Sequence, residues 1–403
     1  MRVVITGIGA VSSLGYNVDS FTQGLQTGQV GIGPIQQIPE IAQLQTQIAA
    51  EVPAYDPLQH FTQRELAIYD RFTQFQLLSA REAVADAGLE FSGELAERTS
   101  VILGSGIGGQ TTQEENYKRL YQKESKRLPP LTVPKLIPSS AVSHVSIEFG
   151  ITGPAFTVAS ACASSAHALI QSYLILQSGL VDVAVTGGSE ACITFGSVKG
   201  WDSLRVTSNS FCRPFSLDRS GINLGEGSGT LMLETLEHAQ SRNAPIYAEV
   251  LGFGMSSDAS HVVQPTVEGP TRAINNALKH AKLNPEDIQY INAHGTGTMQ
   301  NDATETAAIR SAFGVHADAL SVSSTKSMHG HTLGAASALE AIATVKALKN
   351  QFVPPTMNYN QPDPKCDLDY VPNQARDMPV NIALSNSFAF GGLNASIVFK
   401  RFL

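Results

Sequence analysis

Val158-Ala159-Ser160-Ala161-Cys162-Ala163-Ser164-Ser165 is the stretch that decides the fold. An apolar run leads into it, and apolar residues at helical spacing follow it up to a glycine stop at Gly179. The small residues beside Cys162 permit a sharp turn from a strand into a helix, which places the thiol at the helix N-terminus. The helix dipole and unpaired N–H groups there favour a thiolate. The segment predicts a nucleophile; the alternative is that Cys162 is a small buried hydrophobe.

The rest of the chain repeats this style of a short β-branched run that ends in a small-residue turn. The runs are Val3–Thr6, Val101–Leu103, Val181–Thr186, Tyr290–Asn292, Leu320–Ser323 and Ile382–Ser385. The alternation predicts an α/β fold with buried, largely parallel strands. Tyr247–Phe253 is the predicted first strand of a second half, so the chain divides into residues 1–245 and 246–403. Gly7-Ile8-Gly9 is not a dinucleotide turn, because Ser12 replaces the third glycine.

Composition excludes several classes of protein. Charged residues make up 15% of the 403 residues, against about 25% in an average domain, which predicts that some surface is hidden in a subunit interface. The net charge of −8 argues against bulk nucleic-acid binding. No apolar run is long enough to span a membrane, and the N-terminus reads as a first strand, so a cytoplasmic protein is expected. The four cysteines form no CxxC pair, which argues against a zinc ribbon or a disulfide framework.

Two histidines lie in glycine-rich loops that follow short β-branched runs. His294 is followed by Gly295, and His331 lies between Gly330 and Gly334. Flanking glycines allow a ligand to approach the backbone closely, so the two histidines and Cys162 predict one shared site. A metal site is the alternative, formed by Cys162 with both histidines or by His329 with His331. Lys326 opposes it, because a cation there would repel a metal ion.

A third small-residue loop lies near the C-terminus, in Leu384–Asn394. It carries Phe388 and Phe390 in a glycine frame, where two aromatic rings could gate a pocket. Ordinary packing is the alternative role for both rings.

Together these motifs resemble the β-ketoacyl-acyl-carrier-protein synthases of the I/II type, closest to synthase II. The blocks that carry the resemblance are Ala161-Cys162, Arg213-Pro214-Phe215, Gly225–Gly229, His294–Thr298, Lys326–His331 and Asn386–Gly392. The resemblance implies an α/β, thiolase-like fold, with two pseudo-symmetric α/β halves in five α-β-α-β-α layers. Residues 1–245 then carry the nucleophile, and residues 246–403 carry the histidines, the lysine and the gate loop. A homodimer is expected, with a heterodimer as the alternative.

The resemblance also implies a role for each matching residue. Cys162 takes an acyl group from an acyl carrier protein, and His294 and His331 face the malonyl thioester. Lys326 pairs with Glu340 and balances the charge of the site. Glu305 is implied to support this network, Phe390 to gate the pocket, and the N–H groups of Cys162 and Phe390 to form an oxyanion hole. Thr296 and Thr298 are implied to bind the pantetheine arm, and Ile107 and Phe215 to contact the substrate. The residues implied to dock the carrier are Lys126, Arg127, Arg205 and, on a neighbouring helix, Arg64. No cofactor and no metal are implied.

The implied reaction is a decarboxylative condensation with malonyl-acyl carrier protein in fatty-acid elongation. Some residues depart from the usual family pattern, among them Ala389 and Leu393 in the gate loop, Ser216 and His329. With these departures the chain also resembles the synthases of aryl-polyene pathways, so a specialised polyene or polyketide role stays open. Alternatives from other classes are a non-catalytic acyl-binding subunit and a metal-dependent hydrolase.

Overall fold

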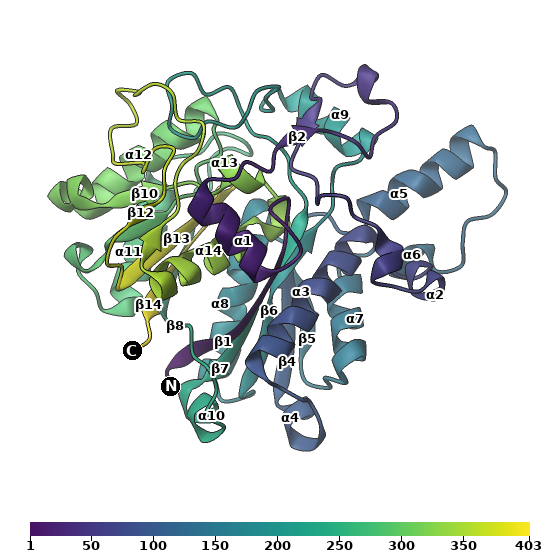
Figure 1. Ribbon diagram of the computed structural model, residues 1–403, viewed down its shortest axis with the longest axis horizontal. Helices are drawn as coiled ribbons and strands as arrows, with labels where there is room; N and C mark the ends of the chain where they lie inside the picture. The colour runs from purple at the N-terminus through teal and green to yellow at the C-terminus, as the bar shows by residue number, and fades with distance from the viewer.

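The computed structural model describes residues 1–403, and its centre is a ten-stranded sheet to which both halves of the chain contribute (Figure 1). The first half supplies β1 (Val3–Val11), β4 (Thr99–Gly104), β5 (Ala155–Val158), β6 (Val183–Glu190) and β7 (Gly227–Thr235). The second half supplies β8 (Ala248–Ser257), β9 (Tyr290–Asn292), β10 (Ser321–Ser323), β13 (Ile382–Ala389) and β14 (Leu393–Arg401). The strand order is β10-β9-β13-β14-β8-β1-β7-β6-β4-β5.

The strand order repeats within the sheet. In each half, from the outer edge inward, the third strand in chain order is followed by the second, fourth, fifth and first. The two first strands, β1 and β8, meet in the middle and pair antiparallel through Val3 with Val250 and Ile5 with Ala248. This repetition confirms the predicted α/β fold with two pseudo-symmetric halves.

The prediction of largely parallel strands is wrong in part. β4 pairs parallel with β5 and β6, and β9 pairs parallel with β10 and β13. The strands toward the middle pair antiparallel, because β13 and β14 form a hairpin and β7 runs against both β6 and β1. A continuous apolar run marks a buried strand but does not give its direction.

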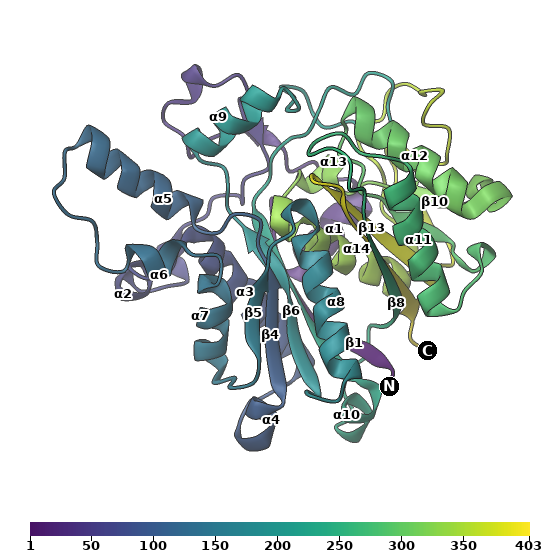
Figure 2. The same ribbon diagram turned by 180° about the vertical axis from the view of Figure 1, so that it is seen from behind.

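Helices cover both halves and fill the space between them (Figures 1 and 2). α8 (Ser164–Gln177) and α14 (Ala336–Asn350) form the middle layer, and each contacts strands of both halves. α3 (Arg71–Ala87) and α7 (Ser140–Phe149) cover the outer face of the first half, and α11 (Glu268–Ala281) and α12 (Met299–Phe313) cover that of the second. Outer helices, the strands of one half, the middle helices, the strands of the other half and outer helices again make the predicted five layers. α14 is apolar or small almost all round, which suits a helix buried on every side.

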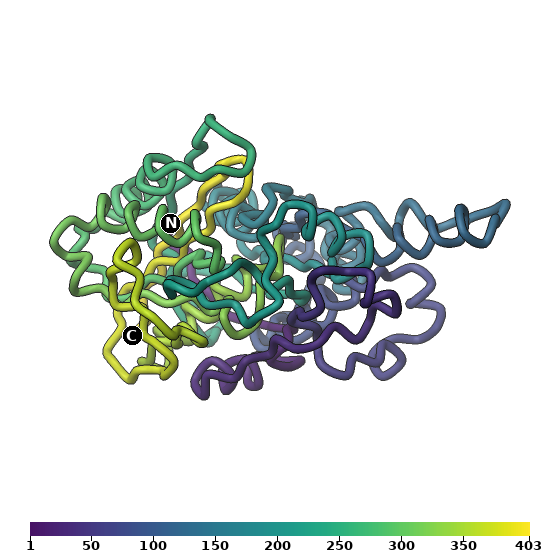
Figure 3. The backbone as a smooth tube through the Cα atoms, turned by 90° about the horizontal axis from the view of Figure 1, so that it is seen from above, coloured from purple at the N-terminus to yellow at the C-terminus, as the bar shows by residue number.

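Shorter elements surround this body. They are α1 (Val18–Thr27), α2 (Gln63–Leu66), α4 (Gly93–Glu97), α5 (Gln110–Tyr117), α6 (Thr132–Leu136), α9 (Phe195–Leu204), α10 (Leu236–Ser241), α13 (Lys326–His329), the two-residue strands β2 (Gly33–Pro34), β3 (Ile48–Ala49), β11 (Phe352–Val353) and β12 (Arg376–Asp377), and several single helical turns. α5 and the loop that follows it form an arm that projects from one side (Figures 1 and 3).

None of the helices has both the length and the apolar composition that crossing a membrane requires. We propose that the two halves divide as predicted, into residues 1–245 and 246–403. The first repeat ends with α10 at Ser241 and the second begins with β8 at Ala248, so the connection between them contains this boundary.

Candidate active site

Cys162 lies where the sequence predicted, in the turn between a strand and a buried helix. β5 ends at Val158, a single helical turn spans Ala161–Ala163, and α8 follows. Ala161 adopts a positive φ of 50°, a conformation that a small side chain tolerates best. Gly104 is required beneath this turn, since a Cβ there would lie 2.4 Å from the backbone of Ser164.

His331 contacts the sulfur directly. Its Nε2 atom lies 3.1 Å from Cys162 Sγ, and its Nδ1 atom accepts the backbone N–H of Leu333 at 3.2 Å. Burial, together with the charge of Lys326, lowers the pKa of His331 well below its usual value, so the ring is neutral. A neutral ring whose Nδ1 is an acceptor carries its proton on Nε2. His331 therefore donates a hydrogen bond toward the sulfur.

His294 is held in the same tautomer by Lys326. The ammonium group of Lys326 donates to the His294 carbonyl oxygen at 2.7 Å and to His294 Nδ1 at 3.3 Å. Burial and the Lys326 charge lower the pKa of His294 well below its usual value. The rings of His294 and His331 meet edge to face with centroids 5.5 Å apart. Two neutral histidines thus bring Nε2–H donors to one site.

Two buried carboxyl groups support these histidines. Glu340 forms an ion pair with Lys326, and neither side chain has any exposed surface. Glu305 accepts the backbone N–H groups of His294 at 2.9 Å and Gly295 at 2.8 Å, which fixes the turn that carries His294. Burial raises the pKa of both carboxyl groups to about 7. Glu305 also accepts a hydrogen bond from the side chain of Asn386 at 3.3 Å, and Glu340 interacts with the site through Lys326.

The thiol is less acidic than the sequence analysis expected. Burial raises the pKa of Cys162 to about 11, although the charge of Lys326 and the backbone N–H groups of Phe390 and Cys162 act in the opposite direction. The expectation of a ready thiolate at the helix N-terminus is therefore wrong for the free enzyme, because it left out the cost of burying the charge. A role of these two N–H groups in an oxyanion hole stays a prediction.

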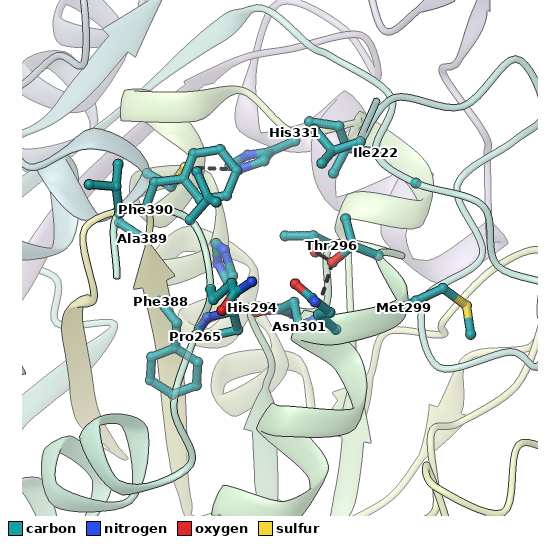
Figure 4. Close-up of a pocket in the computed structure, with 18 of the residues that line it drawn as sticks. Ile222, Pro265, His294, Thr296, Met299, Asn301, His331, Phe388, Ala389 and Phe390 are labelled. Carbon is teal, nitrogen blue, oxygen red and sulfur yellow. Dashed lines mark hydrogen bonds between the residues drawn. The ribbon is translucent and has the colours of Figure 1, made fainter. Parts of the chain in front are cut away.

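A pocket of about 400 Å³ leads to these residues (Figure 4). Its lining includes Cys162, both histidines, and the predicted residues Thr296, Thr298, Phe390 and Arg205. The hydroxyl oxygens of Thr296 and Thr298 lie 3.1 Å apart, and Thr298 also caps α12. The walls combine aromatic and aliphatic side chains with a few polar groups, as small-molecule sites commonly do.

Two predicted substrate contacts lie outside this pocket. Phe215 is fully buried and stacks on Tyr370 with ring centroids 4.0 Å apart, so its predicted contact with substrate is corrected to a packing role. The backbone N–H of Phe215 donates to Asp302 at 2.7 Å, which ties it to the Thr296–Thr298 turn. Ile107 does not line the pocket of the single chain and is 40% exposed on the loop after β4. Its role in acyl binding stays a prediction.

The predicted docking residues do not form one cluster. Arg205 is exposed at the pocket lining, Arg64 lies on the short helix α2, and Lys126 and Arg127 are exposed on the arm. Their docking role stays a prediction.

His329 does not share the site with His331. Its Nε2 atom hydrogen-bonds to Thr325 Oγ1 at 3.0 Å and its ring packs against Phe21. No group of three or more His, Cys, Asp or Glu side chains is arranged to hold a metal ion.

Sequence reasoning missed Glu190, the last residue of β6. Its buried carboxylate accepts the backbone N–H groups of Gly106 at 2.6 Å and Gly334 at 3.1 Å, one from each half of the chain. It thereby ties the loop after β4 to the turn that follows His331. The available signal was an acidic residue that ends the otherwise uncharged stretch Val183–Ser189.

Comparison with known proteins supplies the family. Residues 1–239 match the family described as β-ketoacyl synthase, N-terminal domain, and residues 247–360 match its C-terminal domain. The chain belongs to the β-ketoacyl synthase family. It is therefore an acyl-transferring condensing enzyme, which joins an acyl group to a malonyl unit with loss of CO₂.

Relatives of this β-ketoacyl synthase match it along its whole length. Nodulation protein E of Rhizobium sp. (strain N33) is 46% identical over 400 residues, 99% of each chain. The 3-oxoacyl-[acyl-carrier-protein] synthase 2 of Staphylococcus aureus (strain MRSA252) is 42% identical over 409 residues, covering 100% of this chain and 99% of its own. The solved structure of the ishigamide ketosynthase/chain length factor superposes with a TM-score of 0.93 at 36% identity, covering 100% of this chain and 99% of its own.

Proposed function

We propose that Cys162 is the nucleophile and that His294 and His331 are hydrogen-bond donors to the malonyl thioester. The observation that carries this assignment is the shared tautomer of the two histidines, whose Nδ1 atoms both accept a hydrogen bond. The Nε2–H of His294 is thus left for the substrate, and that of His331 faces the sulfur until Cys162 is acylated. Donors fixed in a dry site stabilise an oxyanion strongly, and one such donor is worth about 10²–10³ in rate.

The first half-reaction transfers the acyl group. The Cys162 sulfur attacks the thioester of an acyl-carrier protein, and the backbone N–H groups of Cys162 and Phe390 hold the oxyanion that forms. The carrier thiol leaves with the proton that Cys162 gives up, so the products are an acyl-cysteine and a free carrier thiol. His331 Nε2–H and the charge of Lys326 favour the thiolate during the attack.

The second half-reaction forms the carbon–carbon bond. The malonyl thioester oxygen lies between the Nε2–H groups of His294 and His331, and loss of CO₂ leaves an enolate on that oxygen. The enolate carbon attacks the acyl-cysteine carbonyl, and collapse of the tetrahedral intermediate releases the Cys162 thiolate, which is reprotonated. Lys326, Glu340 and Glu305 are positioning residues that keep His294 oriented.

We propose an acyl carrier protein as the partner that delivers both substrates. Its phosphopantetheine arm fits the pocket beside Thr296 and Thr298, and carrier proteins are acidic, so the exposed Arg205 at the pocket would attract them. Lys126, Arg127 and Arg64 would extend this attraction. The reaction needs no cofactor, and a cytoplasmic location suits a soluble carrier.

We propose a homodimer formed at the free edge of the sheet. β5 is the outermost strand of the first half, whereas the opposite edge strand β10 bridges to Asp369. An unpaired strand edge favours pairing with another chain. Phe156 on β5 is 41% exposed, and Ile107 is exposed on the neighbouring loop. A second copy there would cover both side chains and bring Ile107 into a shared acyl pocket. The low charged fraction of 15% agrees with such a covered face. A non-identical subunit is the alternative.

We propose fatty-acid elongation as the pathway. A specialised polyene or polyketide pathway is the second candidate, favoured by Ala389 and Leu393 beside the nucleophile and by the likeness to the ishigamide ketosynthase/chain length factor. A non-catalytic acyl-binding subunit is disfavoured, because Cys162 is present with His331 against its sulfur.

The deciding experiment is turnover of the purified protein with malonyl-carrier protein and a set of saturated and polyunsaturated acyl-carrier proteins. Broad use of saturated chains supports elongation, whereas strict preference for conjugated chains supports the specialised pathway. Absence of both an acyl adduct and turnover would overturn the proposed chemistry.

A further inference from the structure

The nucleophile is covered in this structure by one short segment, Ala389–Leu393. Cys162 is 7% exposed and shares a small apolar cluster with Ala389, against which Leu393 packs. Cys162 borders the pocket but has little open surface, so the segment has to move to give a thioester full access to the sulfur. Gly391 and Gly392 both adopt positive φ angles, 82° and 67°, in the turn between β13 and β14. The turn is thus built from residues with unusual backbone freedom.

Three contacts from outside the hairpin hold this segment down. Gly391 donates its N–H to the carbonyl oxygen of Val262 at 2.7 Å, and the carbonyl oxygen of Gly392 accepts the N–H of Asp258 at 2.9 Å. Trp201 stacks on Phe390 with ring centroids 5.8 Å apart and planes inclined by 26°. Val262 is 73% exposed on a surface loop. Trp201 instead belongs to α9 and packs against the same apolar cluster as Phe195. Of these contacts, that of Trp201 is the one made with the Phe390 ring, and it is supported by this packed cluster.

The position of Phe390 matters in two ways. Its ring lies in the pocket beside His331 (Figure 4), and its backbone N–H is directed at the Cys162 sulfur. Any residue that fixes the Phe390 ring in place also fixes this N–H donor. Trp201 is the aromatic side chain that makes this contact.

We propose that Trp201 is a positioning residue: it holds Phe390 over Cys162 and keeps the site closed until a substrate displaces the ring. The consequence for the reaction rests on the proposed function. With the Phe390 ring held beside His331, the unacylated enzyme decarboxylates malonyl-carrier protein slowly, because the ring occupies space that the malonyl group needs next to the histidines. An offset-stacked aromatic pair of this kind shifts an equilibrium about three- to tenfold.

The first test measures access to the thiol and does not depend on the proposed function. Trp201→Ala, Trp201→Phe and the wild type are treated with iodoacetamide, and the modified cysteine is identified by peptide mass spectrometry. Alkylation of Cys162 is expected to be about three- to tenfold faster in Trp201→Ala and close to wild type in Trp201→Phe, which keeps an aromatic ring. Phe195→Ala is the matched control, because Phe195 lies on the same helix and in the same cluster but outside the pocket.

The alkylation rates of the other three cysteines distinguish local opening at Cys162 from partial unfolding of the protein. Cys192, Cys212 and Cys366 are all buried, so a variant that unfolds partially exposes them as well. Faster alkylation of Cys162 alone supports the proposal. An unchanged rate at Cys162, equal gains at all four thiols, or an equal gain in Phe195→Ala would overturn it.

The second test measures decarboxylation of malonyl-carrier protein by enzyme that carries no acyl group. Trp201→Ala is expected to release CO₂ about three- to tenfold faster than wild type, a gain that a merely damaged enzyme would not give. If Trp201→Ala speeds the alkylation of Cys162 but no form of the enzyme, acylated wild type included, decarboxylates malonyl-carrier protein, the proposed function is refuted. The positioning role of Trp201 then still stands. A slower or unchanged release in Trp201→Ala, with acylated wild type active, would overturn the consequence for the reaction.

Discussion

The Nε2 atom of His331 lies 3.1 Å from the Sγ atom of Cys162, although 169 residues separate them in the chain. Each lies near the start of a middle-layer helix, Cys162 just before α8 and His331 just before α14. Both helices contact strands of both halves, so the distance between these two atoms depends on how the halves pack together. The site exists only when the two halves have assembled.

Replacing Cys162 by Ala is expected to abolish acylation by an acyl-carrier protein. The wild type should gain the mass of one acyl group, because one thiol faces His331 and the two backbone N–H donors. Intact-protein mass spectrometry measures the adduct. Cys366→Ala is the control and should keep it, since Cys366 is buried in the second half away from the pocket. An adduct that survives Cys162→Ala would contradict the assignment.

The two histidines are expected to differ when each is replaced by Ala. His294→Ala should slow malonyl decarboxylation about 10²–10³-fold and leave acylation close to wild type, because His294 has no contact with the sulfur. His331→Ala should slow both steps, because it also removes the donor at Cys162 Sγ. Separate assays of CO₂ release and of adduct formation make the comparison. Equal losses in both assays for His294→Ala would argue against this division of roles.

The rate of Cys162 alkylation is expected to keep rising with pH well beyond the range of a free thiol. The thiolate reacts and the thiol does not, and burial raises the pKa of Cys162 to about 11. Lys326 lowers this pKa through its charge, so Lys326→Met should shift the profile to still higher pH. Alkylation rates across a pH series measure the shift. A profile with a midpoint near that of a free thiol, about 8.5, would contradict the stated burial effect.

Sequence patterns located most of the site because its residues lie in short loops directly after buried strands. His294 follows β9, Cys162 follows β5, and His331 comes after β10 and the short helix α13, so the strand ends bring the three residues to one edge of the fold. Phe215 was misassigned because a motif carries no information on which way its ring packs, and here the ring stacks on Tyr370 in the core.

Contacts between distant segments were beyond the reach of sequence reasoning. Trp201 and Phe390 are far apart in the chain, and nothing in either local pattern announces their stacking. Glu190 was missed for the same reason, since its partners Gly106 and Gly334 come from different halves. The thiol pKa was misjudged because the local helix N-terminus is visible in the sequence, whereas the burial produced by Ala389 and Leu393 is not.

Charge reversal at Arg205 is expected to weaken the use of carrier-bound substrates. Arg205→Glu should raise the apparent KM for acyl-carrier protein about tenfold, because an acidic carrier would meet a negative charge at the pocket. The joint change Lys126→Glu with Arg127→Glu should have a smaller effect, since both residues lie out on the arm. A short acyl-pantetheine is the control substrate, and its KM should not change. An equal loss with that substrate would contradict a docking role.

The gate loop offers the last prediction. Ala389 ends β13 opposite Leu393, the first residue of β14. Ala389 shares a small apolar cluster with Cys162, and Leu393 packs against that cluster. Ala389 is not among the residues with positive φ, so the methyl group there causes no backbone strain and acts through the space that it fills.

The double change Ala389→Gly with Leu393→Thr is therefore expected to broaden the range of accepted acyl chains by enlarging the space beside the sulfur. The preference between a preferred and a poorly accepted chain should fall about tenfold, the scale on which pockets discriminate small apolar groups. Competition between acyl-carrier proteins of different chain length and unsaturation measures this ratio, and acylation of Cys162 by the preferred chain is the control and should be retained. An unchanged ratio would show that the departures at Ala389 and Leu393 do not set specificity, and would favour general elongation over a specialised pathway.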